Sequence, residues 1–389
     1  MLRLIENIFR FIASYGLACV LLVLLLLVTF LGTLEQVDHG IYDVKGRYFE
    51  SFLVVHLLLD RIPVALPGAY LLLVLLSINL LCGGVVRMQK TARRIGILIV
   101  HVGIVMLLAA GLLKHQLAVD GHLTLYEGDG SSEFESYYDW EVAVWRADAS
   151  PITEYLIPWD EVLETPHGRS VTFTSPALPF DFTVEEYERN CIPQPASPFT
   201  AEAGERAVDG HFLHGLRKSK EAEENVPGAR VRLRERDSGQ EHEGILWGAS
   251  RWPLAIGLSD AVWAVDLRRR RYTLPFEIVL DTFTREFHPG TTVPKSFMSE
   301  VTCIEDGAEQ RVKISMNKPL RRRDYTFYQA SWGPQEAPPG TRLFSTFAVV
   351  CDPVEKGPLY ASVVITLGLV VHFSMMLGSH LRRESRRTA

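Results

Sequence analysis

Two histidines are the residues most able to do chemistry, because each lies inside a long apolar run. His101 lies seven residues after Arg94, the last charge before its run. His372 lies about seven residues before Ser379, near the basic C-terminal tail. At 1.5 Å per helical residue, both imidazoles are expected roughly 10 Å inside the same face of a membrane. An ionisable side chain at such a depth indicates a functional site by default.

The chemistry open to these two imidazoles is metal ligation. They could ligate one haem iron from both faces, or each could ligate a haem shared with a partner protein. Alternatively, each imidazole only hydrogen-bonds a neighbouring helix. Small residues beside them permit close approach of a helix or a ligand and are equally expected of plain helix packing; these are Gly96, Gly103, Gly368 and Ser374.

The remaining histidines give weaker signals. Four of them flank the apolar runs and could form a second metal or haem site, although solvated positions at the membrane surface are the simpler interpretation; they are His39, His56, His115 and His122. Five others lack convincing metal-ligand spacing and are expected on the surface; they are His167, His211, His214, His242 and His288.

The five cysteines exclude several classes of site. No CxxC or CxxCH spacing occurs, which argues against a zinc ribbon, a thioredoxin-type active site and a c-type haem attached to this chain. Cys303 and Cys351 could pair, and a reactive thiol is an alternative. The chain also lacks a hydrolase nucleophile elbow, a P-loop and a dinucleotide fingerprint, so no catalytic residue is predicted. The net charge of -6 gives no case for nucleic-acid binding.

Four runs without Asp, Glu, Lys or Arg must position the two histidines. They are Phe11 to Leu34, Ile62 to Val86, Ile95 to Leu113 and Gly357 to Leu381. A bilayer core needs about 20 helical residues, so each run predicts a transmembrane helix. The first is too long for a secretory signal, and no cleavage pattern follows it, so it is expected to be retained.

Basic residues flanking the runs predict the orientation. The N-terminus, the link between the second and third runs and the C-terminal tail are all rich in arginine or lysine and fall on one side of a four-helix arrangement. The positive-inside rule makes that side cytoplasmic. Both termini are then cytoplasmic, and residues 35–61 and 114–356 lie outside. In a bacterium this predicts a multi-pass protein of the inner membrane with a large periplasmic domain.

The long segment between the third and fourth runs alternates apolar and polar residues in many short stretches separated by turn residues. This pattern is typical of an all-β sandwich or open-barrel-like domain. The chain is therefore predicted to be an α+β membrane protein. Its parts are residues 1–113 with helices at about 11–34, 62–86 and 95–113, the β-rich domain 114–356, and residues 357–389 with the fourth helix and tail. Residues 193–226 are expected to form a loop or short helices.

Short motifs along the chain resemble those of the ResB-like family. Each is only a few residues long, but their order and their positions relative to the apolar runs match over nearly the whole chain. They are Leu31-Gly32-Thr33-Leu34-Glu35-Gln36, Asn79-Leu80-Leu81-Cys82 before Arg87, His101-Val102-Gly103, Asp120-Gly121-His122 with Glu127-Gly128-Asp129, Pro294-Lys295-Ser296-Phe297 with Ser299, Asn317-Lys318-Pro319-Leu320, and Tyr328-Gln329-Ala330-Ser331.

The resemblance implies a role in system II cytochrome c biogenesis. The chain would be one subunit, not a complete enzyme, of a haem lyase complex that exports haem and attaches it to an apocytochrome c. Implied partners are a CcsA/ResC-type membrane protein, which carries a tryptophan-rich segment that this chain lacks, the apocytochrome c and a thioredoxin-like thiol reductant. The implied cofactor is non-covalent haem b, which the chain could share with the partner. His101 matches the family's membrane histidine, whereas His372 is added from its depth alone.

One departure from the family keeps an alternative open. Between Gly32-Thr33 and Gln36 the family often has a longer spacer with a proline, and here only Leu34-Glu35 is present. The chain could therefore be a ResB-like structural or electron-transfer subunit of another membrane redox complex. A membrane-anchored sensor is a third reading, but the tail after Leu381 is too short for a cytoplasmic output domain.

Overall fold

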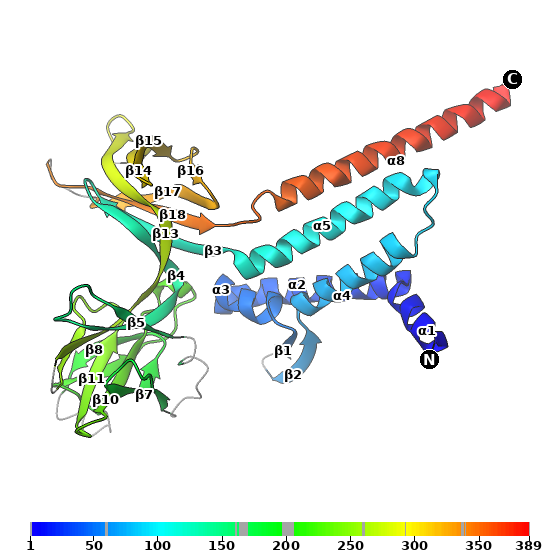
Figure 1. Cartoon of the computed structure of the whole chain (residues 1–389). Helices are drawn as coiled ribbons and strands as arrows, with labels where there is room; N and C mark the ends of the chain where they lie inside the picture. Colours follow the sequence, from blue (N-terminus) through cyan, green and yellow to red (C-terminus); the bar gives the residue numbers. More distant parts are fainter. Residues whose placement is uncertain are drawn as a thin grey trace. The chain divides into compact units, whose positions relative to one another are not determined.

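The structure is a computed structural model, and it describes residues 2–388 except 59–60, 160–161, 163–169, 197–205, 259–260, 292, 336–337 and 339. The chain forms two compact units. Unit 1 comprises Met1–Ala118 and Cys351–Ala389, and unit 2 comprises Val119–Val350. Unit 1 is mainly helical and unit 2 is built from strands (Figure 1).

Unit 1 contains the apolar helices. Among the described residues, four helices are long and apolar enough to cross a membrane, as the charge-free runs predict. The elements of unit 1 are α1 (Leu2–Ile12), α2 (Tyr15–His39), α3 (Ile41–Val44), η1 (Lys45–Phe49), β1 (Leu53–Leu58), β2 (Ile62–Pro67), α4 (Ala69–Leu80), η2 (Leu81–Val86), η3 (Ala92–Arg94), α5 (Ile95–Leu117) and α8 (Gly357–Thr388).

Two helix boundaries differ from those predicted. The second apolar helix begins at Ala69 and not at Ile62, because residues 62–67 form strand β2 of a hairpin with β1. Pro63 and Pro67 cannot donate helical hydrogen bonds and disfavour helix in the residue before each. The first apolar run is also broken, since α1 ends at Ile12 and α2 starts at Tyr15.

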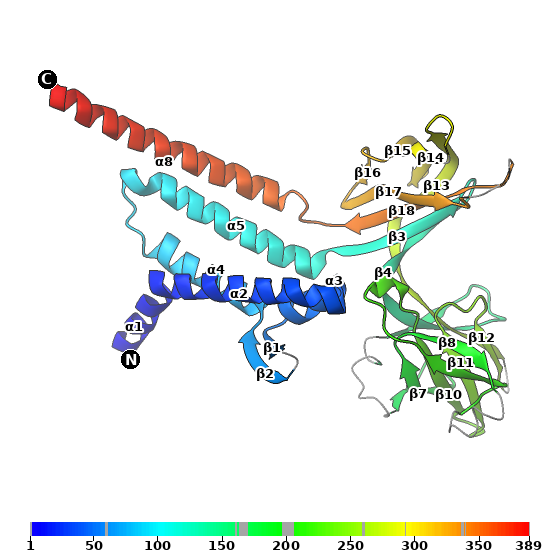
Figure 2. The ribbon, with the colours of Figure 1, turned by 180° about the vertical axis from the view of Figure 1, so that it is seen from behind.

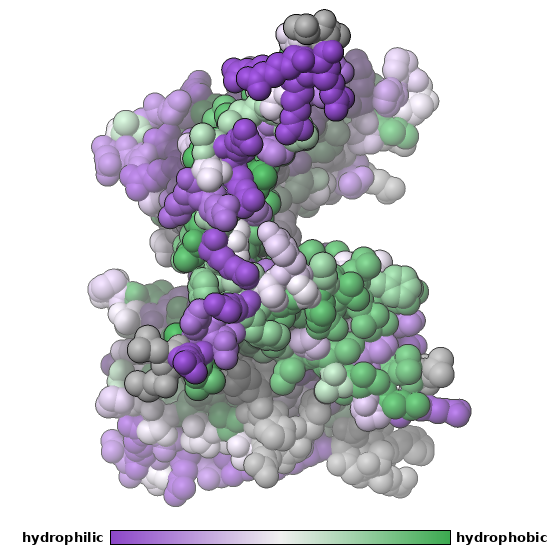
Figure 3. Space-filling view, turned by 90° about the vertical axis from the view of Figure 1, so that its right-hand side faces the viewer, coloured by the Kyte–Doolittle hydropathy of each residue, from purple (hydrophilic) through white to green (hydrophobic). Residues whose placement is uncertain are grey.

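The basic segments of unit 1 gather at one end of its helices. The N-terminal helix α1, the link between η2 and α5 and the C-terminus of α8 lie at this end in both views (Figures 1 and 2). Figure 3 views the molecule from this end. It shows hydrophilic residues that extend downward from the C-terminal tail, next to a hydrophobic surface. We call this the basic end of unit 1. Elements α3, η1 and the β1–β2 hairpin follow α2 at the opposite end (Figure 1).

Helices α5 and α8 pack against each other through glycines. A Cβ atom added at Gly96 would lie 2.6 Å from the His372 backbone nitrogen, and one at Gly103 would lie 3.0 Å from the Ile365 nitrogen. A Cβ atom at Gly368 of α8 would lie 2.7 Å from the Val100 nitrogen. Only glycine allows backbones to approach this closely, as in other small-residue helix interfaces.

Unit 2 is built from strands that follow the alternating stretches of the sequence. Residues 181–184 lie in β7, 229–234 in β10, 325–330 in β17 and most of 343–350 in β18, as the pattern predicts. The strands are β3 (Val119–Tyr126), β4 (Gly130–Arg146), β5 (Glu154–Pro158), β6 (Val171–Phe173), β7 (Phe180–Glu188), β8 (Cys191–Pro195), β9 (His211–Gly215), β10 (Gly228–Glu235), β11 (Glu241–Trp247), β12 (Leu254–Gly257), β13 (Val262–Phe287), β14 (Pro294–Glu305), β15 (Ala308–Ser315), β16 (Leu320–Arg322), β17 (Tyr325–Gly333) and β18 (Phe344–Cys351).

Two sheets pack face to face in the first half of unit 2. One has the strand order β11-β10-β7-β6, and the other is formed by β5, β12 and parts of β4 and β13. Buried side chains from both sheets form one core that includes Trp159, Phe180, Phe182, Leu233 and Val265. This half is therefore a β-sandwich.

The second half of unit 2 is a curled sheet with the order β15-β14-β13-β4-β3-β18-β17-β16. Strands β14 and β17 are far apart in this order, yet Ser299 of β14 contacts Gln329 of β17. The sheet must therefore curl around its core, which includes Phe134, Ile278 and Phe327. In the described residues the sheet stays open between β15 and β16, so it is not a closed barrel.

The prediction for residues 193–226 was wrong in part. Strands β8 and β9 pair here as an antiparallel hairpin, with Cys191 opposite Gly215 and Pro195 opposite His211. The short 3₁₀ helix Ala222–Glu224 follows. Two prolines in β8 and the charged residues after β9 hide the alternation that identifies the other strands.

Candidate functional site

His101 lies on α5 and packs against the π-helical turn η2. A Cβ atom added at Gly84 would lie 3.0 Å from the Cγ atom of the His101 ring and 3.1 Å from its Cδ2. Glycine at position 84 therefore makes room for the imidazole. The Nδ1 atom of His101 is buried and has no hydrogen-bond partner among the described residues.

The turn η2 separates His101 from the N-terminal part of the chain. Gly84 faces the imidazole, and a Cβ atom added at Gly83 would lie 3.0 Å from the carbonyl oxygen of Ala13, between α1 and α2. Single π-helical turns inside α-helices are frequent at functional sites. Two adjacent glycines thus let η2 contact a ring on one side and a helix break on the other.

His372 lies on the face of α8 that packs against α5. Its backbone contacts Gly96, and its ring lies 5.5 Å from that of Phe373. As in His101, the Nδ1 atom is buried without a hydrogen-bond partner among the described residues.

The two histidines occupy different faces of the α5–α8 pair. Gly96 and Gly103 lie on the same face of α5 and contact α8, and His101 is rotated about 140° from Gly96. His372 is level with Gly96, so His101 lies roughly 7.5 Å farther along the helix axis. The two rings therefore lie at different heights along the α5–α8 pair, and the tight α5–α8 contact favours separate environments for them.

The two imidazoles fit iron ligation in one respect. Histidine binds a metal through an unprotonated ring nitrogen, and both rings carry a buried nitrogen that has no hydrogen-bond partner in the described part of the chain. The described residues contain no group of three or more His, Cys, Asp or Glu side chains arranged to hold a metal ion. A haem iron needs only one or two such ligands, because the porphyrin supplies the others. Haem ligation by His101 and His372 stays a prediction.

The end of unit 1 opposite the basic end carries a second cluster of polar residues around Glu35. The carboxylate of Glu35 lies 3.1 Å from Arg47, 3.3 Å from His39 and 3.8 Å from Nδ1 of His56. The hydroxyl of Tyr48, which is fully buried, lies 2.6 Å from the same His56 nitrogen. Burial first, and the charge of Glu35 second, raise the pKa of the Tyr48 phenol.

The other flanking histidines divide between ion pairs and a separate pocket. His115 lies 3.3 Å from Glu50, and Glu50 also pairs with Lys45 at 3.0 Å. His39 is solvated, as expected, but His56 is mostly buried by its contacts. His122 belongs to unit 2. In the described residues these histidines lie within 4 Å of glutamate carboxylates and form no cluster of metal-ligating side chains.

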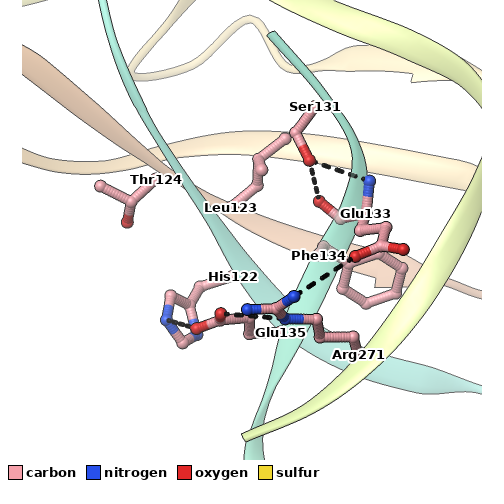
Figure 4. A pocket seen from close by; sticks show the side chains of 8 residues that line it. All are labelled: His122, Leu123, Thr124, Ser131, Glu133, Phe134, Glu135 and Arg271. Carbon is pink, nitrogen blue, oxygen red and sulfur yellow. Dashed lines mark hydrogen bonds and ion pairs between the residues drawn. The ribbon is translucent and has the colours of Figure 1, made fainter. Parts of the chain in front are cut away.

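Unit 2 has a polar pocket where strands β3 and β4 separate. The two strands pair at Gly121–Ser136 and His122–Glu135, and the pocket beyond has a volume of about 360 Å³. Figure 4 shows a row of side chains along it. His122 lies 3.8 Å from Glu135, Glu135 lies 3.8 Å from Arg271, and Arg271 lies 3.9 Å from Glu133.

The environment of His122 favours the neutral form of its ring. Burial lowers the pKa of His122, which Glu135 raises in part and Arg269 lowers further. The ring stacks on Tyr137 with centroids 5.2 Å apart. The pocket can therefore accept a polar or cationic group at Glu133 and Glu135, but its ion pairs are long and its rim is exposed, so it defines no reaction.

The arginine run in β13 is only partly a solvated face. Arg268 is partly buried between Glu141, at 3.0 Å, and Glu154, at 2.9 Å. Hydrogen bonds from Arg268 lower the pKa of Glu154, although burial partly offsets them. Arg269 lies over the ring of Trp140 at 4.1 Å. These side chains hold β13 to β4 and β5, and the arginines of the run are partly buried at 268–270 and exposed at 271.

The cysteines of unit 2 are structural. Cys303 is an unpaired thiol inside the core of the curled sheet, so the disulfide with Cys351 is not formed. Burial raises the pKa of the Cys303 thiol. Burial, with a smaller contribution from Glu188, raises the pKa of Cys191 to about 12. Neither group has the low pKa of a reactive thiol.

Cys191 is expected to resist alkylation in the folded protein. At pH 8 a thiol with a pKa of about 12 is almost entirely protonated, and the thiolate is the reactive form. Iodoacetamide should leave the Cys191 peptide unmodified before unfolding and label it fully in denaturant, as measured by mass spectrometry. Rapid labelling of Cys191 in the native protein at pH 8 would contradict this assignment.

Two of the late motifs meet in a buried hydrogen-bond network. The Ser299 hydroxyl lies 2.7 Å from Oε1 of Gln329 and 2.9 Å from the Ser345 hydroxyl. Nε2 of Gln329 donates to the Ser345 hydroxyl at 2.7 Å. All three side chains are buried. The motif residues Ser299 and Gln329 therefore have a structural task, which is to join β14 to β17 and β18 inside the curled sheet.

Replacing Ser299 by alanine is expected to destabilise unit 2 by about 1–3 kcal/mol, because Oε1 of Gln329 would lose its buried partner. Ser296→Ala is a matched control in the same strand, since the Ser296 hydroxyl lies 3.3 Å from the exposed carboxylate of Glu286. Its effect should stay within about 0.5 kcal/mol. Denaturant unfolding followed by tryptophan fluorescence measures both; equal midpoints would show that the network adds nothing.

Comparison with known proteins gives the family context. Residues 259–339 match the ResB-like family model. No curated protein matches the chain. The matched segment runs from β13 through β17 and includes the motifs at 294–299, 317–320 and 328–331. It also includes two members of the buried network, Ser299 and Gln329. In residues 259–339 the chain is therefore ResB-like, as its motifs indicate.

Proposed function

We propose that this chain is a ResB-like subunit of a cytochrome c biogenesis complex. The observation that carries the proposal is the ResB-like match over residues 259–339, joined in one chain to four helices able to cross a membrane. In this proposal the subunit works with a CcsA/ResC-type membrane protein, which brings the tryptophan-rich segment. Together they move haem outward and attach it to an apocytochrome c whose thiols a thioredoxin-like protein keeps reduced.

The proposal assigns a task to each unit. Unit 1 spans the bacterial inner membrane, and its basic end, with both termini, is cytoplasmic. His101 and His372 would bind haem b, which supplies the vinyl groups to be joined to the apocytochrome. The buried, unpartnered Nδ1 atoms of both rings support this role. Unit 2 is periplasmic, where it braces the partner and holds the apocytochrome.

Deleting the gene and restoring it on a plasmid tests the proposal. Covalent haem staining of membrane proteins should lose the c-type bands in the deletion strain and regain them on complementation, whereas b-type cytochromes should persist. Co-purification from the complemented strain should bring down a CcsA/ResC-type protein and haem b. Normal c-type cytochromes in the deletion strain would refute a role in thioether formation.

The second candidate is a structural or electron-transfer subunit of another membrane redox complex. The short spacer between Gly32-Thr33 and Gln36 favours it, because the spacer departs from the family pattern. In that case the deletion strain would keep its c-type cytochromes but lose a membrane redox activity. The protein would then co-purify with oxidoreductase subunits.

A further inference from the structure

The N-terminal helix α1 has eleven residues and two distinct faces. One face carries Arg3, Glu6, Asn7 and Arg10, and the amino group Nη2 of Arg10 lies 2.6 Å from Glu6. The other face carries only apolar side chains, and several are exposed; these are Leu4 at 64%, Ile5 at 59%, Ile8 at 50% and Phe11 at 66%. An amphipathic helix whose apolar face meets no protein needs another apolar partner.

The break between α1 and α2 is built by specific hydrogen bonds. The side-chain amide of Asn79 in α4 donates to the carbonyl oxygens of Ile12, at 2.5 Å, and Ser14, at 3.0 Å. Arg87 donates to the carbonyl oxygen of Ala13 at 3.3 Å. These carbonyls would otherwise be unsatisfied at the end of α1. Asn79 is 7% exposed, so its contacts are shielded from water.

The start of α2 is fixed in the same way. The hydroxyl of Ser14 accepts a hydrogen bond from the backbone nitrogen of Leu17 at 3.2 Å, which is an N-cap. Ala13 packs on Gly83 of η2. Because both sides of the break are satisfied, α1 does not continue α2, and both ribbon views show it turned away from the α2 axis (Figures 1 and 2).

We propose that α1 lies in the membrane interface, with its apolar face among the acyl chains and Arg3 and Arg10 among the lipid headgroups of the leaflet at the basic end. This rests on the membrane assignment in the proposed function. Helix α2 also exposes apolar side chains, among them Val23, Leu26 and Phe30. Helices with one apolar and one charged, lysine- or arginine-bearing face bind at this depth. Anionic headgroups complement the two arginines.

The position of α1 bears on His101. Gly83 contacts Ala13 at the break, and the next residue, Gly84, contacts the His101 ring. A helix held in the interface thus fixes the break, the break packs on η2, and η2 supports the imidazole. Asn79 and Arg87 belong to this arrangement through the break, where they donate to the carbonyl oxygens of Ile12, Ser14 and Ala13.

Tryptophan variants of the full-length protein in lipid vesicles test the proposal. All seven native tryptophans lie in unit 2, so the wild type supplies a constant background. Ile8→Trp places an indole on the apolar face of α1, Asn7→Trp places one on the polar face, and Leu26→Trp reports on α2. The vesicles contain phosphatidylcholine and phosphatidylglycerol, with or without brominated acyl chains.

Brominated chains should quench Ile8→Trp at least about twofold more than Asn7→Trp, because an apolar face lies about 5–10 Å into the interface. Leu26→Trp should be strongly quenched if α2 spans the bilayer. Strong quenching of Leu26→Trp with equal quenching at positions 7 and 8 would overturn the interfacial helix and leave the proposed function intact. Absence of quenching at Leu26→Trp would overturn the membrane assignment and, with it, this proposal.

Discussion

Replacing His101 by alanine is expected to reduce the haem b that co-purifies with the protein and its partner by about tenfold or more. Even residues that only orient metal ligands cost 10–100-fold in metal affinity when replaced, so a ligand should cost at least about as much. Pyridine haemochrome content per protein and the Soret band measure the effect.

His372→Ala should lower the haem content independently of His101→Ala, because His372 lies on the α5–α8 contact whereas His101 faces η2. His380→Ala is the matched control, since His380 is exposed on the same helix α8 and pairs with Glu384 at 3.4 Å. It should leave the haem content unchanged. If both His101→Ala and His372→Ala retained the full Soret band, haem binding by these residues would be ruled out.

Replacing Gly96 by alanine is expected to separate α5 from α8. The added Cβ atom would lie 2.6 Å from the His372 nitrogen and 2.8 Å from the Gly368 oxygen, and backbone atoms cannot rotate away as a flexible side chain can. Overpacking of this kind costs about 1–3 kcal/mol. The shift should also move His372 and lower its haem binding. Circular dichroism of the purified protein in detergent measures the loss of helical stability on heating.

Gly111 provides the control on the same helix. A Cβ atom at Gly111 would meet nothing within 4 Å. Gly111→Ala should therefore be neutral or stabilise α5 by up to about 1 kcal/mol, because alanine has the higher helix propensity. Equal melting temperatures for Gly96→Ala and Gly111→Ala would mean that the close helix contact does not form.

The elements that the sequence predicts best are those with a strong local pattern. Charge-free runs identify the four apolar helices, and alternation identifies strands such as β7, in which Phe180, Phe182 and Val184 are buried in turn. The β8–β9 hairpin lacks this alternation and was missed. Strand β2 was assigned to a helix because charge alone does not distinguish a short apolar hairpin from the start of a span.

The candidate site depends on contacts that local sequence patterns do not predict. The sequence locates His101 and His372 along their helices. What each histidine packs against depends on glycines in the neighbouring helices. The break after Ile12 has no proline or glycine to mark it, and it depends on Asn79 and Arg87, more than sixty residues away. The motif that contains Asn79 could be recognised in the sequence by its resemblance to the ResB-like family. The role of Asn79 at the break between α1 and α2 could be seen only in the structure.

Strands β4 and β13 tie the two halves of unit 2 into one folding unit. β13 has 26 residues and β4 has 17, and each contributes buried side chains to both the sandwich core and the core of the curled sheet. Neither core can be completed while the other is open, so both should be lost in a single cooperative transition. A destabilising substitution in the sandwich, far from the curled sheet, would then lower the abundance of the whole subunit, including the segment that is ResB-like.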